Sequence, residues 1–250
     1  VRAALPAPLR ALLFGPLSAL WPASARLPRP MRLKTILGNL AVADVEAYYR
    51  DLAWLREDTR AQVYSPDFMR SLQGFSPRET VFDHYLRNGA ADAVGRAQHA
   101  DIHSYMTDDV LAKVDRMSMA HALEVRCPLM DHRLIEFAAR LPTALKMNGR
   151  RGKLPLRRVA ERRLPAELLA MPKRGFSIPA AQWLRESLRP MAEELLFGPP
   201  RAVLDLLDRA QLRRVWTEHL SGARDHHVFL WAVMMLALWH DQARSAAGAR

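Results

Sequence analysis

The strongest constraint on this chain is a helical spacing of apolar residues that returns along most of its length. Val42, Val45, Tyr48, Leu52 and Leu55 recur three and four residues apart, which places them on one face of a helix. Similar patterns predict a mainly α chain, with helices over residues 41–56, 66–73, 78–88, 107–121, 132–141, 154–163, 180–195, 203–219 and 226–243.

One segment alternates like an extended strand. From Leu123 to Pro128, apolar and charged residues alternate before a proline ends the pattern. We expect the apolar side chains to point inward and Glu124 and Arg126 to point outward. Cys127 lies on the apolar side with no histidine beside it in sequence, so we interpret it as a small buried hydrophobic residue, not a nucleophile.

Cap residues predict where two of the helices begin. Thr107 precedes Asp108 and Asp109, whose carboxylates favour the positive end of a helix, and Asp131 precedes the run that starts at His132. In that second helix an apolar face of Leu134, Ile135, Ala138 and Leu141 is predicted to be core.

The two ends of the chain differ in character. Residues 1–33 are rich in proline and arginine and predict a connector with short helical pieces at best, while residues 34–250 form the folded body. The first residue is Val, and we expect the chain to start partway through a longer protein. Val228–Trp239 is apolar all round but shorter than the about 18 residues of a membrane span, so it predicts a buried helix and no membrane association.

The charge of the chain favours polyanions without identifying one. Lys and Arg number 37 against 26 Asp and Glu, which gives a formal charge of +11. The aromatic residues lie in apolar runs and no RNA-binding or helix-turn-helix signature is present, so we predict no nucleic-acid partner. A basic helical binding module without catalysis remains an alternative. The single cysteine excludes an intramolecular disulfide and fits a reducing compartment.

Common catalytic motifs are absent from the sequence. It contains no GxGxxG, GxxxxGK[ST], HExxH, GxSxG or CxxC. His99 and His103 lie four residues apart with Asp101 between them, but no third and fourth ligand follow at a known metal spacing. We therefore predict no metal site within this chain.

A proline-bounded loop carries one of only five lysines. Met171–Pro179 reads MPKRGFSIP, in which Gly175 allows a close backbone approach and Lys173 could neutralise phosphate or pyrophosphate charge. A solvated basic turn is the alternative interpretation.

A second segment brings charged residues to the ends of predicted elements. The 24-residue run from Asp108 to Asp131 contains a helix, the extended segment and the next helix cap. Sites are often built at such ends, and a buried structural ion-pair network is the alternative. The charged residues concerned are Asp115, Arg116, Glu124 and Arg126.

These blocks resemble the C-terminal part of the glutamine-hydrolysing asparagine synthetase family. The resemblance covers about residues 84–242 and rests on DDVLAKVDRMSMAHALEVRCPLMDHRLIEFAARLP, GRRGKLPLRR, LLAMPKRGFSIPAAQWLR and FLWAVMMLALW. It implies the helical C-terminal portion of an α/β ATP-pyrophosphatase-type (adenine nucleotide alpha hydrolase-like) synthetase domain, with the parallel sheet mostly upstream. β-Lactam synthetases, lasso-peptide cyclases and other amidotransferase-like relatives share these blocks, so a different amide product remains an alternative.

The resemblance also implies a reaction. ATP and Mg²⁺ activate the side-chain carboxylate of aspartate to a β-aspartyl-adenylate, and ammonia from glutamine displaces AMP to give asparagine. The sequence lacks the catalytic N-terminal cysteine, the SGGxDS phosphate loop and a GGDE-like segment. We therefore expect a cytoplasmic synthetase fragment that is inactive without the glutaminase and the phosphate loop. Homodimerisation stays open.

Two residues match positions to which the family assigns a role, and Arg126 lies two residues beyond one of them, on the same side of the extended segment. Lys173 of PKRGF matches a lysine thought to neutralise the α-phosphate and departing pyrophosphate. Glu124 of LEVR matches a glutamate that assists a tyrosine base in lactam-forming relatives and would orient substrate in the asparagine branch. Arg126 would either bind a substrate carboxylate or hold Glu124 in place.

Overall fold

The computed structural model confirms the predicted mainly helical chain. It describes residues 5–22, 28, 33–53, 55, 57–87, 89, 92–149, 151–171 and 178–248. Within these ranges all regular elements are helices. Two isolated antiparallel β-bridges also occur there, between Tyr64 and Leu207 and between Asn148 and Arg151.

The chain divides into two compact units. Unit 1 comprises Val1–Ser76 and Ser177–Arg250, and unit 2 comprises Pro77–Phe176. The helices of unit 1 are α1 (Ala7–Leu20), α2 (Lys34–Ala41), α3 (Asp44–Leu52), α4 (Glu57–Val63), α5 (Pro66–Ser71), α13 (Ala180–Arg185), α14 (Arg189–Phe197), the 3₁₀ helix η4 (Ala202–Leu206), α15 (Arg209–Ser221) and α16 (His227–Gly248). Those of unit 2 are α6 (Pro77–Leu86), α7 (Ala93–Asp101), the π-helix η2 (Ile102–Leu111), α8 (Ala112–Met119), the 3₁₀ helix η3 (Pro128–Met130), α9 (His132–Arg140), α10 (Thr143–Lys146), α11 (Leu154–Ala160) and α12 (Ala166–Ala170).

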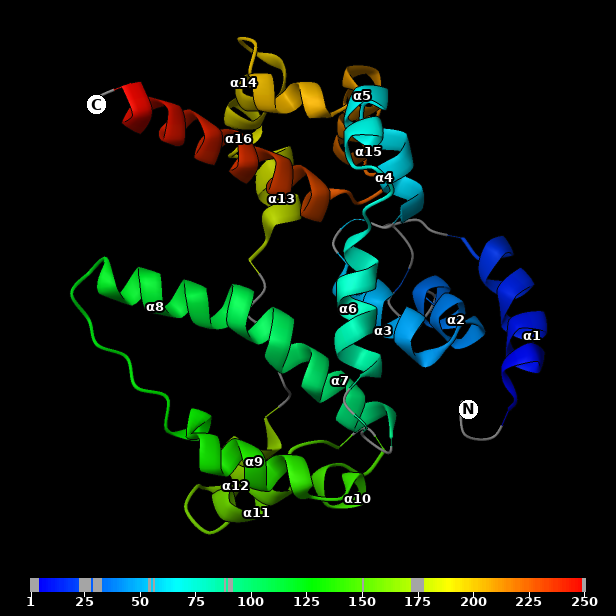
Figure 1. Ribbon diagram of the computed structural model, residues 1–250, viewed down its shortest axis with the longest axis vertical. Helices are drawn as coiled ribbons and strands as arrows, with labels where there is room; N and C mark the ends of the chain where they lie inside the picture. The colour runs from blue at the N-terminus through cyan, green and yellow to red at the C-terminus, as the bar shows by residue number, and fades with distance from the viewer. Residues whose placement is uncertain are drawn as a thin grey trace. The chain divides into compact units, whose positions relative to one another are not determined.

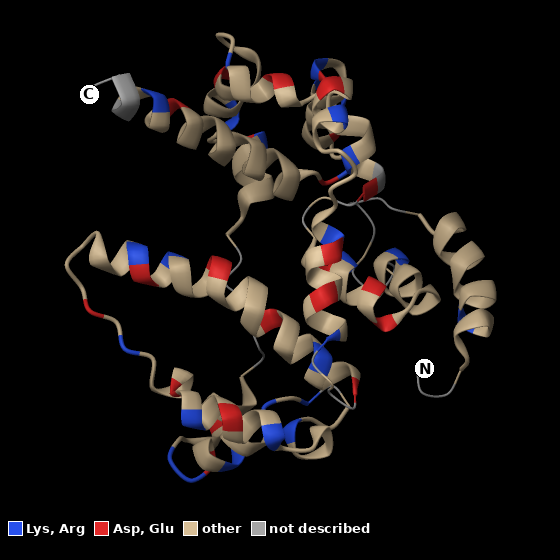
Figure 2. Ribbon diagram, in the orientation of Figure 1, with Lys and Arg blue, Asp and Glu red and all other residues tan. Residues whose placement is uncertain are grey.

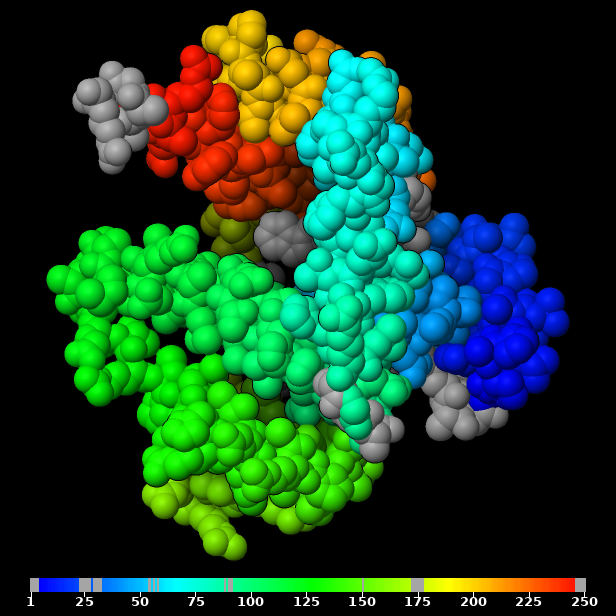
Figure 3. All heavy atoms as spheres, viewed as in Figure 1, coloured from blue at the N-terminus to red at the C-terminus, as the bar shows by residue number. Residues whose placement is uncertain are grey.

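Helix α16 forms the centre of the unit 1 core. It packs against α13, α14 and η4, and its side chains lie in contact with those of α14 in Figure 3 (yellow against orange and red; ribbon in Figure 1). The predicted helix over the apolar run is confirmed, and its burial is confirmed for one face: Leu230 and Met234 are buried whereas Trp239 is exposed. No helix in the described part of the chain is long and apolar enough to cross a membrane.

Backbone hydrogen bonds join the two sequence segments of unit 1. Ser65 N–H donates to the Leu206 carbonyl at 2.9 Å, and Asp208 N–H donates to the Val63 carbonyl at 2.8 Å. The Asp208 carboxylate then caps α15 by accepting from Gln211 N–H at 2.9 Å. Fully buried Val63 belongs to the same apolar core as α16, so the core includes residues from both segments.

The region predicted as a connector contains a long helix. α1 has 14 residues and continues through Pro16, which cannot donate a helical hydrogen bond. Ser18 Oγ donates to the Lys34 carbonyl at 3.2 Å and Lys34 Nζ to the Trp21 carbonyl at 3.1 Å, which ties α1 to α2. The prediction of short helical pieces was wrong, because alanines and leucines favour helix strongly enough to tolerate one proline.

In unit 2, α7, η2 and α8 follow one another without a break. Residues 102–111 adopt the rare π-helix, and Thr107 lies inside it. Thr107 Oγ1 donates to the Ser104 carbonyl at 3.2 Å. The prediction that Thr107 caps a new helix was therefore wrong, since the preceding residues already occupy helical turns and leave no terminus there.

Unit 2 buries little apolar surface. Among its described residues only Tyr85 and Ala100 are buried apolar side chains. Leu134 and Ala138 of α9 are exposed and Ile135 is half-buried, so the predicted core face of this helix was wrong. Periodicity correctly placed these residues on one face, but the described residues contain nothing that covers it.

The difference in burial between the two units predicts that shortening an apolar side chain costs more stability in unit 1 than in unit 2. Leu230 is 0% exposed in unit 1 and Leu156 is 45% exposed in unit 2. We expect Leu230→Ala to lower the free energy of unfolding by about 2–5 kcal/mol through lost burial and a cavity. Leu156→Ala should change it by about 0.5 kcal/mol or less. Urea unfolding of both variants checks this, and equal losses would contradict the assignment of the core.

Candidate functional site

The structure describes two of the three predicted site residues, Glu124 and Arg126, but not Lys173. Lys173 lies among residues 172–177, outside the described part of the chain, so its role stays a prediction. Met171 and Ile178, on either side of this gap, are both exposed. Glu124 and Arg126 are described, in the segment between α8 and η3 of unit 2.

The end of α8 sets the direction of that segment. Leu123 N–H donates to the Ser118 carbonyl at 2.9 Å and Ala122 N–H to the Met119 carbonyl at 3.0 Å, the pair of bonds that forms a Schellman motif. Ala122 adopts φ of 55°, the left-handed conformation that this motif requires and that glycine usually supplies. The turn leads directly into Leu123 and Glu124.

Glu124 and Arg126 contact each other. Arg126 Nε donates to Glu124 Oε1 at 2.7 Å, and Arg126 Nη2 lies 2.6 Å from the same oxygen. The Arg126 side chain is 85% exposed and that of Glu124 70%, so the buried ion-pair network weighed as an alternative is not formed by these residues. Asp115 and Arg116, in α8, are exposed as well. An exposed pair of this kind stabilises a fold little, and its main effect is to fix the direction of the two side chains.

The predicted strand and the predicted burial of Cys127 were wrong. Residues 123–127 have no regular structure, and Leu123, Val125 and Cys127 are all exposed. A strand needs a neighbour to pair with its backbone, and no described strand is available. Glu124 and Arg126 nevertheless share one side of the segment, as the alternation predicts.

Asp131 begins α9, as predicted. Its carboxylate accepts from Arg133 N–H at 2.9 Å and from the Arg133 guanidinium at 2.8 and 3.0 Å. These hydrogen bonds, first from the guanidinium and then from the backbone, hold the pKa of Asp131 below its usual value. A carboxylate committed to its own helix terminus is poorly placed to act on a substrate.

The described histidines do not form a metal site. The His99 and His103 rings stack at 4.1 Å, and the Nδ1 atoms of both lie 2.9 Å from backbone carbonyls of His84 and His99, respectively. Across the described residues, no three His, Cys, Asp or Glu side chains are arranged to hold a metal ion. The described residues therefore provide no group of ligands for the Mg²⁺ that the resemblance implies, and no catalytic step is assigned to this ion.

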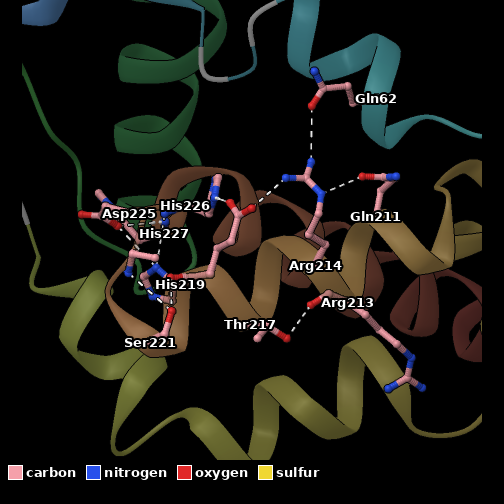
Figure 4. A network of polar contacts seen from close by, with 12 residues as sticks. Gln62, Gln211, Arg213, Arg214, Thr217, His219, Ser221, Asp225, His226 and His227 are labelled. Atoms are coloured by element: carbon pink, nitrogen blue, oxygen red, sulfur yellow. Dashed lines mark hydrogen bonds and ion pairs between the residues drawn. The ribbon is translucent and has the colours of Figure 1, made fainter. Parts of the chain in front are cut away.

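A network of polar contacts joins the end of α15 to the start of α16 (Figure 4). Glu218 contacts His226 Nε2 and Arg214 Nη1, each at 2.7 Å, and Asp225 contacts His227 Nδ1 at 2.8 Å. Burial alone would raise the pKa values of both carboxyl groups, but their hydrogen bonds and the nearby positive charges outweigh it and lower them. These acids are ionised and already paired.

His219 is the fully buried member of this network. Its Nδ1 accepts from His226 N–H at 3.2 Å, and Arg185 Nε donates to the His219 carbonyl at 2.8 Å. Burial, followed by the charge of Arg185, lowers the pKa of His219 to about 4. A neutral imidazole that accepts a backbone hydrogen bond holds the turn before α16, which is a structural role. Gly222, which ends α15 at φ of 71°, was the sequence signal for this turn.

The lowered pKa of His219 predicts acid sensitivity. In the unfolded state His219 has a pKa of 6.5 and is protonated below that pH, whereas in the folded state it stays neutral until the pH approaches 4. Because the unfolded state binds more protons in this range, the free energy of unfolding falls as the pH falls from 6.5 to 4. Between pH 7 and 5 we expect a loss of about 2 kcal/mol that is absent in His219→Gln. Urea unfolding at both pH values measures it, and equal pH dependence of the two proteins would contradict the buried neutral state.

The left-handed backbone conformation of Ala122 predicts that replacing this residue by glycine stabilises the protein. Ala122→Gly removes the Cβ strain, and after the larger entropy of the unfolded chain is subtracted, we expect a gain of about 0.5–1 kcal/mol. Ala138→Gly, on exposed α9, is the matched control and should cost about 1 kcal/mol. A loss of stability on thermal unfolding of Ala122→Gly would show that residue 122 does not adopt this conformation.

Comparison with known proteins places these residues in a family. The family model described as asparagine synthase matches residues 11–241. A putative glutamine-hydrolyzing asparagine synthetase of Mycobacterium tuberculosis is 34% identical over 247 residues, which is 94% of this chain and 34% of that protein. Glutamine-hydrolyzing asparagine synthetase 1 of Bacillus subtilis is 24% identical over 221 residues, 87% of this chain and 34% of that protein.

More distant similarity extends to a protein with another name. Amidase chry2 of Gibberella zeae is 30% identical over 132 residues, 50% of this chain and 19% of that protein. No solved structure matches the chain. The chain spans about a third of the length of the first two curated relatives. Because the family model covers most of its residues, the chain belongs to the asparagine synthase family.

Proposed function

We propose that this chain works within a glutamine-dependent asparagine synthetase, as the C-terminal portion of an α/β ATP-pyrophosphatase-type domain. The observation that carries the proposal is the family match over residues 11–241, which includes Lys173, Glu124 and Arg126. The relatives named asparagine synthetase support aspartate, ATP and glutamine as substrates. Family membership favours this proposal over a basic binding module without catalysis. The cytoplasm is the proposed location.

The proposed chemistry proceeds in two balanced steps. An oxygen of the aspartate side-chain carboxylate attacks the α-phosphorus of ATP, and the bond to the departing pyrophosphate breaks. Ammonia then attacks the acyl carbon, AMP leaves with the former carboxylate oxygen, and the nitrogen loses a proton to give asparagine.

Lys173 is proposed to stabilise charge on the α-phosphate and on pyrophosphate. A fixed ammonium at that position favours the transition state, where negative charge on the leaving group grows. Glu124 is proposed to orient substrate, and Arg126 holds the Glu124 carboxylate through the observed contacts on Oε1. Fixing the acid before substrate arrives reduces the cost of reaching a reactive geometry.

Exposed apolar side chains of unit 2 are proposed to contact the segment that carries the phosphate loop. The 250 residues contain no SGGxDS motif, so adenylation requires this loop from residues outside them. Apolar side chains that are exposed in residues 117–137, the stretch of sequence that contains Glu124 and Arg126, would be covered by that contact. They include Met117, Met119, Leu123, Val125, Leu129, Leu134 and Phe137.

A different amide product is the second candidate. The similarity of half of this chain to a protein named an amidase supports this candidate. A panel of carboxylate acceptors in the exchange assay below separates the candidates. In an asparagine synthetase, aspartate should be the one acceptor of the panel that supports exchange between pyrophosphate and ATP.

The lysine loop provides the test of function. In the enzyme assembled with its phosphate loop, we expect Lys173→Ala to abolish aspartate-dependent exchange between pyrophosphate and ATP while glutaminase activity survives. Lys113→Ala removes an exposed lysine that pairs with Asp109, and it should leave exchange unchanged. Exchange at the wild-type rate in Lys173→Ala would refute the role of this loop.

A further inference from the structure

Arg10 is a buried cation that no described residue neutralises. It lies in the first turn of α1 and is only 7% exposed. Its Nε and Nη1 atoms are buried and have no hydrogen-bond partner in the structure. The inward side of α1 therefore contains a guanidinium, while Leu9, Leu12 and Leu13 on the same helix are exposed.

An unpaired buried guanidinium is unfavourable. Arginine does not lose its proton in proteins, so it cannot relieve the cost of burial by becoming neutral. Neither α1 nor α2 contains an aspartate or glutamate, and Arg10 is the single charged residue of α1 (Figure 2). In α3, Glu46 pairs with Arg50 at 2.9 Å and Asp51 accepts from Asn39 Nδ2 at 2.6 Å. Asp44, the third acid of this helix, has a partner as well.

The start of α1 is a second, independent electropositive feature. Pro6 provides no side-chain cap and the first turn contains no acidic residue. Pro8 has no N–H, and the N–H groups of Ala7 and Leu9 have no acceptor within the helix. The positive end of a helix attracts anions. In a helix the Cα–Cβ bonds tilt toward the N-terminus, so the Cβ atom of Arg10 lies on the N-terminal side of its Cα atom, the side of these N–H groups.

We propose that Arg10 and the first turn of α1 bind an oxyanion of the phosphate or carboxylate class. A guanidinium offers paired N–H donors that match two oxygens of either group, and the helix N–H groups supply further donors. The anion is a free ion from solution or a carboxylate presented by another polypeptide segment. This site is independent of the proposed synthetase chemistry, because it requires neither Lys173 nor Glu124.

Thermal unfolding in inorganic phosphate tests the site. With chloride used to hold ionic strength constant, phosphate at about ten times its dissociation constant should raise the Tm of the wild-type chain by about 2–4 °C. Arg10→Met should show no rise and, without phosphate, should melt no lower than wild type because it lacks the unpaired charge. Arg244→Met removes an exposed arginine from α16 and should keep the full rise.

Two further arms complete the experiment. Acetate replaces phosphate in one: a rise with phosphate identifies a free oxyanion, and a rise with acetate alone identifies a carboxylate such as another segment would present. Arg10→Lys keeps the charge without the planar donors, and it should retain less than half of the wild-type rise. No rise with either anion, or an equal rise in Arg10→Met, would overturn the proposal.

Discussion

The apolar face of α16 is the contact on which unit 1 depends. Leu230, Val233 and Met234 lie in one cluster with residues of α13, α14, η4 and α15, and Val63 joins that cluster from the other sequence segment. Two backbone hydrogen bonds between residues 63–65 and 206–208 connect the same two segments. The burial of one helix face thus connects residues that are more than a hundred positions apart in sequence. The His219 network then fixes how α15 turns into α16.

Unit 2 has no comparable core within the described residues, and it contains the proposed chemistry. Its long helix ends at a strained left-handed alanine, and the segment that follows presents Glu124 and Arg126 among exposed apolar side chains. Charged groups in such a setting gain strength when a partner surface excludes water from them. Under the proposed function, a pair that contributes little to stability would contribute to catalysis once the phosphate-loop segment covers it.

The sequence allowed the helices, one cap and the family to be predicted, because these depend on local spacing and on contiguous motifs. The Asp131 cap and the helix over Val228–Trp239 are confirmed. The exposure of Leu134 and Cys127 was not predictable, since periodicity identifies a face without showing what covers it. The prediction of a helix start at Thr107 was wrong because a good capping residue can also lie inside a continuing helix. The His219 network and the Arg10 environment depend on tertiary packing, which no local pattern records. The role of Lys173 stays a prediction.

Oxygen transfer from aspartate gives the most direct test of the central claim, that this chain takes part in adenylation of a carboxylate. The measurement uses aspartate labelled with ¹⁸O in its side-chain carboxylate, with the enzyme assembled from this chain and its phosphate loop, and follows the label by mass spectrometry. We expect one labelled oxygen in AMP for each amide formed. Label in inorganic phosphate with ADP as the nucleotide product would contradict it, because the carboxylate would then have attacked the γ-phosphorus.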